Sequence, residues 1–261
     1  MLNKLMKYDF KSLFRSLIPM YLILFLLGLL NRFGNFIQSK LPILSIPAGF
    51  ITTMYFIVII AIPIVTFIIT ILKFYNNLTK DEGYLMHTLP VKKSSLILSK
   101  LITGIIAMVT SIIISIIGLL IGSYDIYFNA KFISIAFDIL IKINSFMPIG
   151  LFIVSMGLSV ILQQLLIYAS ISLGQMHSNN KLIYAFIYGV ILYNVTQAVT
   201  GLIILIPTIL NDNFMKAMNS NTPPFNILNE FLLGSCILTL LIIIAYFVLT
   251  TKAMEKKLNL E

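Results

Sequence analysis

Charged residues are scarce in this sequence, and their scarcity excludes most soluble proteins. Of its 261 residues, 10% are Asp, Glu, Lys or Arg, and 59% are hydrophobic. A soluble domain carries about 25% charged residues, so the sequence excludes a soluble enzyme. The only cysteine is Cys236, which excludes an intrachain disulfide framework. Leu, Ile, Val and Phe are too abundant for a disordered chain.

Several chemical motifs are also missing from the sequence. The phosphate-loop pattern G-x-x-x-x-G-K-[ST] is absent, so the chain is not expected to bind ATP by such a loop. The zinc motif H-E-x-x-H is absent, and the two histidines, His87 and His177, fall in predicted loops. No set of nucleophile, base and acid is recognisable. The sequence therefore predicts a protein that is not an enzyme, with no catalytic residue, no metal site and no cofactor of its own.

Long apolar runs bounded by charged residues predict an all-α membrane protein with six transmembrane helices. A bilayer core about 30 Å thick needs roughly 20 apolar residues for each crossing. Period-2 alternation, the pattern of half-buried strands, is missing from these runs. The predicted spans, which together make a transmembrane domain over 16–251, cover about 16–36, 47–73, 95–121, 146–173, 182–208 and 228–251.

The segment before the first span, residues 1–15, has an amphipathic pattern. Apolar side chains recur at spacings of three and four, while basic residues occupy the opposite face. Such a helix lies in the headgroup plane of a membrane. We therefore predict an interfacial elbow helix here, and a cytoplasmic tail over residues 252–261. The apolar face consists of Leu2, Leu5, Met6, Phe10, Leu13 and Phe14.

The net charge of +9 comes from basic residues at the ends of the apolar runs, which indicates membrane topology and not nucleic-acid binding. With a cytoplasmic N-terminus, thirteen Lys and Arg residues fall on the inner side and five on the outer side. Basic residues accumulate on the cytoplasmic side of membrane proteins. Both termini are therefore predicted to be cytoplasmic.

The loop between the second and third predicted spans contains a helix signal. Thr79 and Glu82 form a capping box, and Pro90 cannot continue a helix. This pattern predicts a short helix on the cytoplasmic face, which could fill a groove in a soluble partner. An ordinary solvated hairpin is the alternative, and capping alone favours it.

Segments of this loop resemble a known family. The sequence Asp81-Glu-Gly-Tyr-Leu85, then Thr88-Leu-Pro-Val91 and Leu98-Ser-Lys100, resembles a signature of bacterial ATP-binding-cassette (ABC) transporter permeases of the type V, or ABC-2-like, exporter class. The opening Leu5-Met-Lys-Tyr-Asp-Phe10, the segment Ser172-Leu-Gly-Gln175 and the tail Lys256–Glu261 resemble the same group.

The resemblance implies a permease subunit in the bacterial cell membrane that pairs with a second copy or a related permease. Separate cytoplasmic ABC ATPase subunits, which bind ATP and Mg, would drive it. Export of peptides or hydrophobic cargo, with antimicrobial peptide resistance as one setting, would be the function. The first cytoplasmic loop would hold the coupling helix that docks on the ATPase. That role is carried over to Asp81, Glu82, Gly83, Tyr84, Leu85, Thr88, Leu89 and Pro90.

Polar residues within the spans are candidates for a substrate path. Carboxylates, the usual mark of ion coupling, do not occupy the centre of any predicted span, and Glu230 lies at the outer end of the sixth. An amphipathic or lipid-like cargo therefore suits the path better than a small ion. Hydrogen bonding between helices is the structural alternative. The candidate residues are Gln163, Gln164, Asn194, Thr196 and Gln197.

Two other functions stay open at this point. One is a secondary carrier or channel that works without an ATPase. The other is a membrane-bound sensor or immunity protein that blocks a toxin without moving it.

Overall fold

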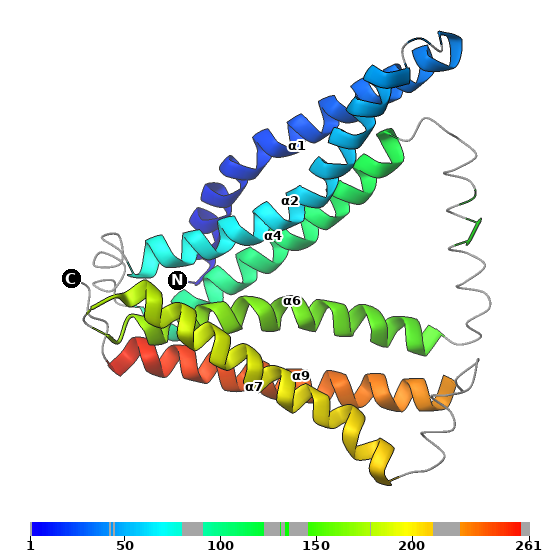
Figure 1. The fold of residues 1–261 in the computed structure, drawn as a ribbon. Helices are drawn as coiled ribbons and strands as arrows, with labels where there is room; N and C mark the ends of the chain where they lie inside the picture. The colour runs from blue at the N-terminus through cyan, green and yellow to red at the C-terminus, as the bar shows by residue number, and fades with distance from the viewer. Residues whose placement is uncertain are drawn as a thin grey trace. The chain divides into compact units, whose positions relative to one another are not determined.

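The computed structural model is almost entirely helical in the part of the chain that it describes. It describes residues 2–41, 43, 45–79, 91–122, 131, 134–135, 146–177, 179–210 and 225–256. The order of the helices is shown in Figure 1. They are α1 (Leu2–Lys40), α2 (Ser45–Thr79), α4 (Lys93–Gly122), α6 (Phe146–Gly174), α7 (Lys181–Leu210) and α9 (Phe225–Lys256).

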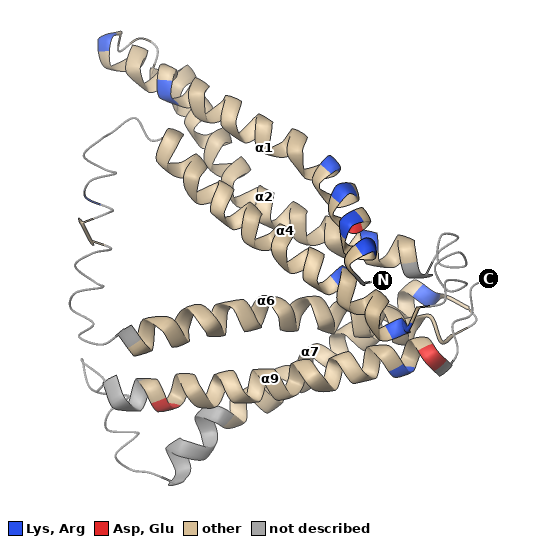
Figure 2. Cartoon of the chain, turned by 180° about the vertical axis from the view of Figure 1, so that it is seen from behind, with Lys and Arg blue, Asp and Glu red and all other residues tan. Residues whose placement is uncertain are grey.

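Each predicted span lies inside one of these helices, and all six helices are long and apolar enough to cross a membrane. This is the fold of a multi-pass membrane protein. Figure 2 shows the reason: Lys and Arg gather near helix ends, whereas the long central stretches hold almost none. Helix α9 continues to Lys256, so the first half of the predicted tail is helical, and residues 257–261 lie outside the described residues.

The elbow helix predicted over residues 1–15 is not a separate element. Helix α1 is one unbroken helix of 39 residues that includes both the amphipathic segment and the first span. The physical reason is that no helix breaker separates the two parts, and the only proline inside the helix, Pro19, falls within the span. The amphipathic pattern itself is real, because Lys4, Lys7 and Lys11 are exposed.

The chain divides into two compact units, Met1–Lys73 with Leu98–Ile139, and Phe74–Ile97 with Leu140–Glu261. The first unit contains α1, most of α2 and most of α4, which run side by side (Figure 1). Leu24, Tyr55 and Ile62 form the centre of its apolar core, and Leu13, Leu17 and Ala107 form a second apolar cluster.

Three polar layers join the helices of the first unit. The first layer consists of Asp9, Ser12, Lys73, Ser99 and Lys100. The middle layer consists of Tyr21, Thr66 and Ser111, in which the Ser111 hydroxyl is 2.7 Å from both of the other hydroxyls. The third layer consists of Asn31, Thr52 and Gly122, in which Asn31 donates to the last carbonyl of α4 at 2.9 Å and accepts from Thr52 at 2.7 Å.

The layers fix the direction and register of the helices. Partners on α1 and α4 are 90 or 91 residues apart in all three layers, so these two helices are parallel and in constant register. Helix α2 runs antiparallel to both. At 1.5 Å per residue, the first and third layers lie about 33 Å apart along α1, close to the thickness of a bilayer core of about 30 Å. The outer layers therefore match the two membrane surfaces, and the middle layer matches the bilayer centre.

The second unit is built around α6, which packs against α9 and α7. Tyr246 on α9 reaches α7, where its hydroxyl lies 2.7 Å from the Thr196 hydroxyl and donates to the Leu192 carbonyl at 2.9 Å. The end of α6 lies very close to α7: a Cβ atom added at Gly174 would be 2.6 Å from the backbone nitrogen of Ala185. Only glycine therefore fits this crossing.

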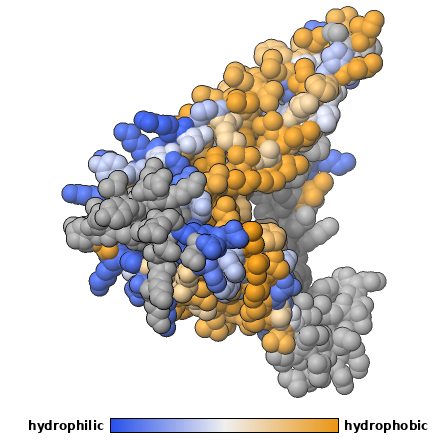
Figure 3. All heavy atoms as spheres, turned by 60° about the vertical axis from the view of Figure 1, so that its left-hand side comes forward, coloured by the Kyte–Doolittle hydropathy of each residue, from blue (hydrophilic) through white to orange (hydrophobic). Residues whose placement is uncertain are grey.

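Apolar side chains cover much of the outer surface in the view of Figure 3. Ile57, Ile60 and Phe56 on α2 and Leu241 on α9 are each about half or more exposed. Such a surface is unfavourable in water and is the surface that lipid tails require.

Candidate functional site

The predicted coupling segment, Asp81 to Pro90, lies outside the described residues. The helices that flank it are described. Helix α2 ends at Thr79, and α4 begins at Lys93. The structure therefore gives the ends of the two flanking helices, and the docking residues between them stay a prediction.

A buried ion pair lies near the start of α4, in the first polar layer. The Lys100 ammonium contacts the Asp9 carboxylate, and their side chains are only 6% and 10% exposed. The second carboxylate oxygen of Asp9 accepts a hydrogen bond from the Ser99 hydroxyl at 2.5 Å. Both oxygens of the carboxylate thus have a donor, which is what a buried charge requires. The pair fixes α1 against the second turn of α4.

The other flanking helix is attached to α1 in the same layer. The Lys73 ammonium donates to the Ser12 side chain and, at 3.3 Å, to the Ser12 backbone carbonyl. Asp9 and Ser12 are three residues apart, so they lie on one face of α1. This one face of α1 therefore holds both helices that lead into the predicted coupling segment.

In the second unit, the first turn of α4 has a separate partner. The Lys93 ammonium donates to the Met254 carbonyl in the last turn of α9 at 2.5 Å. A cation at a helix C-terminus is favoured by the helix dipole. The first two turns of α4 are therefore anchored at Lys93 and again at Lys100.

Sequence reasoning missed this cluster. Asp9 and Lys100 are 91 residues apart, and no local pattern joins them. A signal was present, however: Asp9 is the only acidic residue among the basic residues of the first segment, and Lys100 is the only charged residue of α4 beyond its first residue, Lys93. A lone carboxylate and a lone ammonium in apolar surroundings predict each other as partners.

The structure places the five predicted path residues in different surroundings. Gln163, Asn194 and Gln197 are exposed on the surface of their helices. Asn194 donates to the Val190 carbonyl of its own helix at 2.8 Å. Thr196 is buried against Tyr246. The structural alternative, hydrogen bonding between helices, accounts for Thr196.

Gln164 is different from the other four. Its side chain on α6 is completely buried, and neither its amide nitrogen nor its amide oxygen has a hydrogen-bond partner among the described residues. One turn further along α6, the Tyr168 ring stacks on Phe74 with centroids 3.8 Å apart. A buried amide without partners costs about 1–3 kcal/mol. Among the described residues of the second unit, Gln164 is the buried side chain whose amide nitrogen and amide oxygen both lack a partner.

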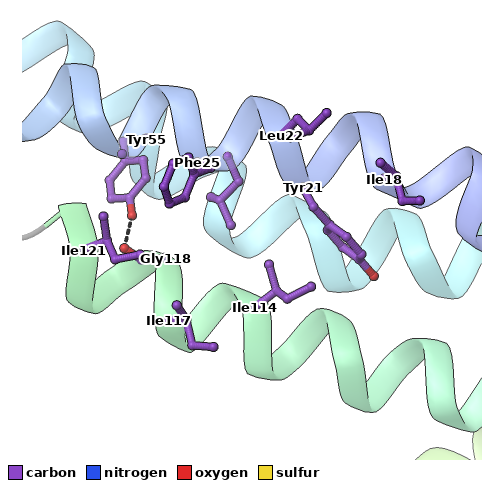
Figure 4. Close-up of a pocket in the computed structure, with 11 residues that line it drawn as sticks. Ile18, Tyr21, Leu22, Phe25, Tyr55, Ile114, Ile117, Gly118 and Ile121 are labelled. Atoms are coloured by element: carbon purple, nitrogen blue, oxygen red, sulfur yellow. Dashed lines mark hydrogen bonds between the residues drawn. The ribbon is translucent and has the colours of Figure 1, made fainter.

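The first unit contains an apolar cavity of about 330 Å³ (Figure 4). Its polar groups are the Tyr21 and Tyr55 hydroxyls. Tyr21 pairs with Ser111, and Tyr55 donates to the Gly118 carbonyl, as the dashed line in Figure 4 marks. Because both hydroxyls already have a hydrogen-bond partner, the cavity offers mainly hydrocarbon contacts.

A metal centre is not found in the described part of the chain, where no group of three or more His, Cys, Asp or Glu residues comes together. Comparison of the chain with family models, with curated proteins and with solved structures gives no match. Function therefore has to be argued from the residues and their arrangement.

Proposed function

We propose that this chain is the permease subunit of an ATP-driven exporter of the ABC class, located in a bacterial cell membrane with both termini in the cytoplasm. It would act with cytoplasmic ATPase subunits, which bind ATP and Mg, and with a second permease, identical or related. The cargo would be a peptide or another amphipathic or hydrophobic molecule.

The observation that carries the proposal is the contact of Asp9 with Ser99 and Lys100. Two segments that resemble the exporter permeases, Tyr8-Asp9-Phe10 and Leu98-Ser99-Lys100, are far apart in sequence but in contact in space. Ser99 and Lys100 are in the second turn of α4, the helix that follows the third such segment, Asp81 to Pro90, in the sequence. Two of the three resembling segments are therefore in contact in the first unit, and the third precedes α4 in the sequence, which supports a common role for them.

The contacts at the start of α4 suggest how movement of the ATPase would reach the other helices. An ATPase that moved the segment 81–90 would displace the first turns of α4. Lys100 would transmit that displacement to α1, and Lys93 would transmit it to the end of α9. Charged and hydrogen-bonded contacts in a low-dielectric region are stiff, because separating them leaves a charge unpaired.

The proposal is tested with the full chain and a substitution in the docking segment. We expect Tyr84→Ala to leave the chain inserted in native membranes but to remove the ATPase that co-purifies with it, measured as Mg-dependent ATP hydrolysis in the eluate. ATP-dependent uptake of a labelled amphipathic peptide into inverted vesicles should be lost in parallel. Tyr193→Ala is the matched control, because Tyr193 is 55% exposed and lies outside the segments that resemble the exporter permeases.

Two results would count against the proposal, and they differ from each other. If Tyr84→Ala retained both hydrolysis and uptake, the segment 81–90 would not be the docking site. If the purified wild-type chain moved the peptide across liposomes without any ATPase, the chain would be a carrier that works alone.

The role of Gln164 gives a second prediction. Gln164→Met keeps the side-chain length and removes the unpartnered amide. We therefore expect the free energy of unfolding to increase by about 1–3 kcal/mol, measured as a higher melting temperature in detergent. If Gln164 lies on the substrate path, as the sequence predicts, peptide uptake should also fall, because the cargo loses a polar contact. Gln163→Met is the control: Gln163 is the exposed neighbour on the same helix, and neither quantity should change. A lower melting temperature for Gln164→Met would instead indicate a structural hydrogen bond.

A further inference from the structure

The second unit has an open groove between the last turns of α6 and α9. Its volume is about 590 Å³, within the range of small-molecule sites. The lining is apolar apart from one residue, Lys252. The residues that line it are Leu173, Met176, Ala245, Val248, Leu249, Lys252 and Ala253.

The floor of the groove contains the small residues Ala245 and Ala253, and larger residues form its sides. Ala245 and Ala253 lie two turns apart on α9, on either side of the turn that bears Leu249. Val248 is 41% exposed and Met176 is 38% exposed, so the groove opens to the surroundings of the helices. Methionine adapts to irregular apolar partners because its chain is unbranched and flexible. The walls of the groove thus suit a hydrocarbon chain.

The position of Lys252, the only charged residue of the groove lining, indicates which headgroup the ligand has. Lys252 ends the uncharged run that follows Glu230, so it lies where the apolar part of α9 ends. Ala245 is seven residues earlier, about 10 Å deeper along the helix axis. An ammonium group at the membrane surface above a cleft for hydrocarbon matches a phospholipid with an anionic headgroup.

The ammonium of Lys252 is available for such a contact. Lys252 is exposed and forms no hydrogen bond or ion pair with another described residue, and no acidic residue lines the groove. Glu255 is the only acidic residue between 252 and 257, where the sequence has three lysines. The local charge therefore favours an anion.

We infer that this groove binds an anionic membrane phospholipid, with one acyl chain against Ala245, Val248 and Leu249 and the headgroup phosphate at Lys252. The site requires only that the chain is in a membrane, and it does not depend on the proposed export function. By the predicted topology it faces the cytoplasmic leaflet, which is the leaflet rich in anionic lipids.

The absence of tryptophan from the chain allows a direct test. Val248→Trp places a single fluorophore in the groove of the full chain. The protein is reconstituted in phosphatidylcholine vesicles that contain a minor fraction of either brominated phosphatidylglycerol or brominated phosphatidylcholine. We expect the anionic lipid to quench with about fivefold higher relative affinity, the equivalent of the roughly 1 kcal/mol that one lysine contributes near an anionic surface.

Matched variants separate the groove from the general membrane surface. Lys252→Gln should abolish the preference, whereas Lys11→Gln, at another exposed lysine, should preserve it. Ile68→Trp is the control reporter, because Ile68 is 47% exposed and lies five residues before Lys73, whose ammonium donates to Ser12. It should show no preference. Leu249→Trp is a second groove reporter if the first variant does not fold.

Three results would overturn the inference. Equal quenching by the two lipids would show that the groove does not recognise an anionic headgroup. A preference that survives Lys252→Gln would assign the effect to overall charge. No quenching by either lipid would show that protein, such as a second copy of the chain, covers the groove.

Discussion

Lys100→Met is expected to lower the free energy of unfolding by about 3–5 kcal/mol, because it leaves the buried Asp9 carboxylate without its counter-charge. The Ser99 hydroxyl would remain as its single donor. Asp9→Leu should also lower the free energy of unfolding, because it removes the carboxylate that the buried Lys100 ammonium contacts. The measurement is the unfolding midpoint in a detergent titration of the purified full chain.

The double variant makes this prediction specific. Asp9→Leu combined with Lys100→Met removes both charges, so it should recover most of the stability that either single change loses. Lys7→Met is the control, because Lys7 is exposed on the same helix as Asp9, and it should change the midpoint little. If the two single variants were as stable as this control, the buried pair would not exist in the folded protein.

Gly174→Ala is expected to destabilise the second unit by about 1–3 kcal/mol, the usual cost of an overpacked contact. The added Cβ would lie 2.6 Å from the backbone nitrogen and 2.7 Å from the Cα of Ala185. Backbone atoms cannot rotate away as a side chain can, so α6 and α7 would have to separate. Thermal unfolding monitored by circular dichroism would show the loss.

Gly157→Ala is the matched control on the same helix. A Cβ atom at Gly157 would meet nothing within 4 Å, and alanine is a better helix former than glycine by about 1 kcal/mol. This variant should be as stable as the wild type or more stable. Equal destabilisation by the two alanine substitutions would contradict the close crossing at Gly174.

The sequence predicts the six spans well, because each depends on a local property. An uncharged run of more than 20 residues, such as the one that ends at Lys73, must be helical when no water is present to bind its backbone. The elbow helix was predicted from amphipathicity, which describes the faces of a helix but not its ends. Residues 2–15 have the expected faces, yet they continue into the span within α1.

The polar contacts could not be predicted in the same way. Gln163 and Gln164 are identical in type and adjacent in sequence, but about 100° of helix rotation separates them, and one is exposed while the other is buried. The pairing of Asp9 with Lys100 depends on how α1 and α4 align, which no single segment encodes. The sequence supplies the residues, and only the packing selects their partners.

The constant spacing of the partners on α1 and α4 has a consequence for motion. Sliding either helix by one turn, about 5.4 Å, would break all three polar layers at once, since each depends on the same alignment. Shear between these helices is therefore far more costly than tilting them together. We therefore expect the first unit to move as one rigid body, which can tilt or rotate but whose helices do not slide along one another.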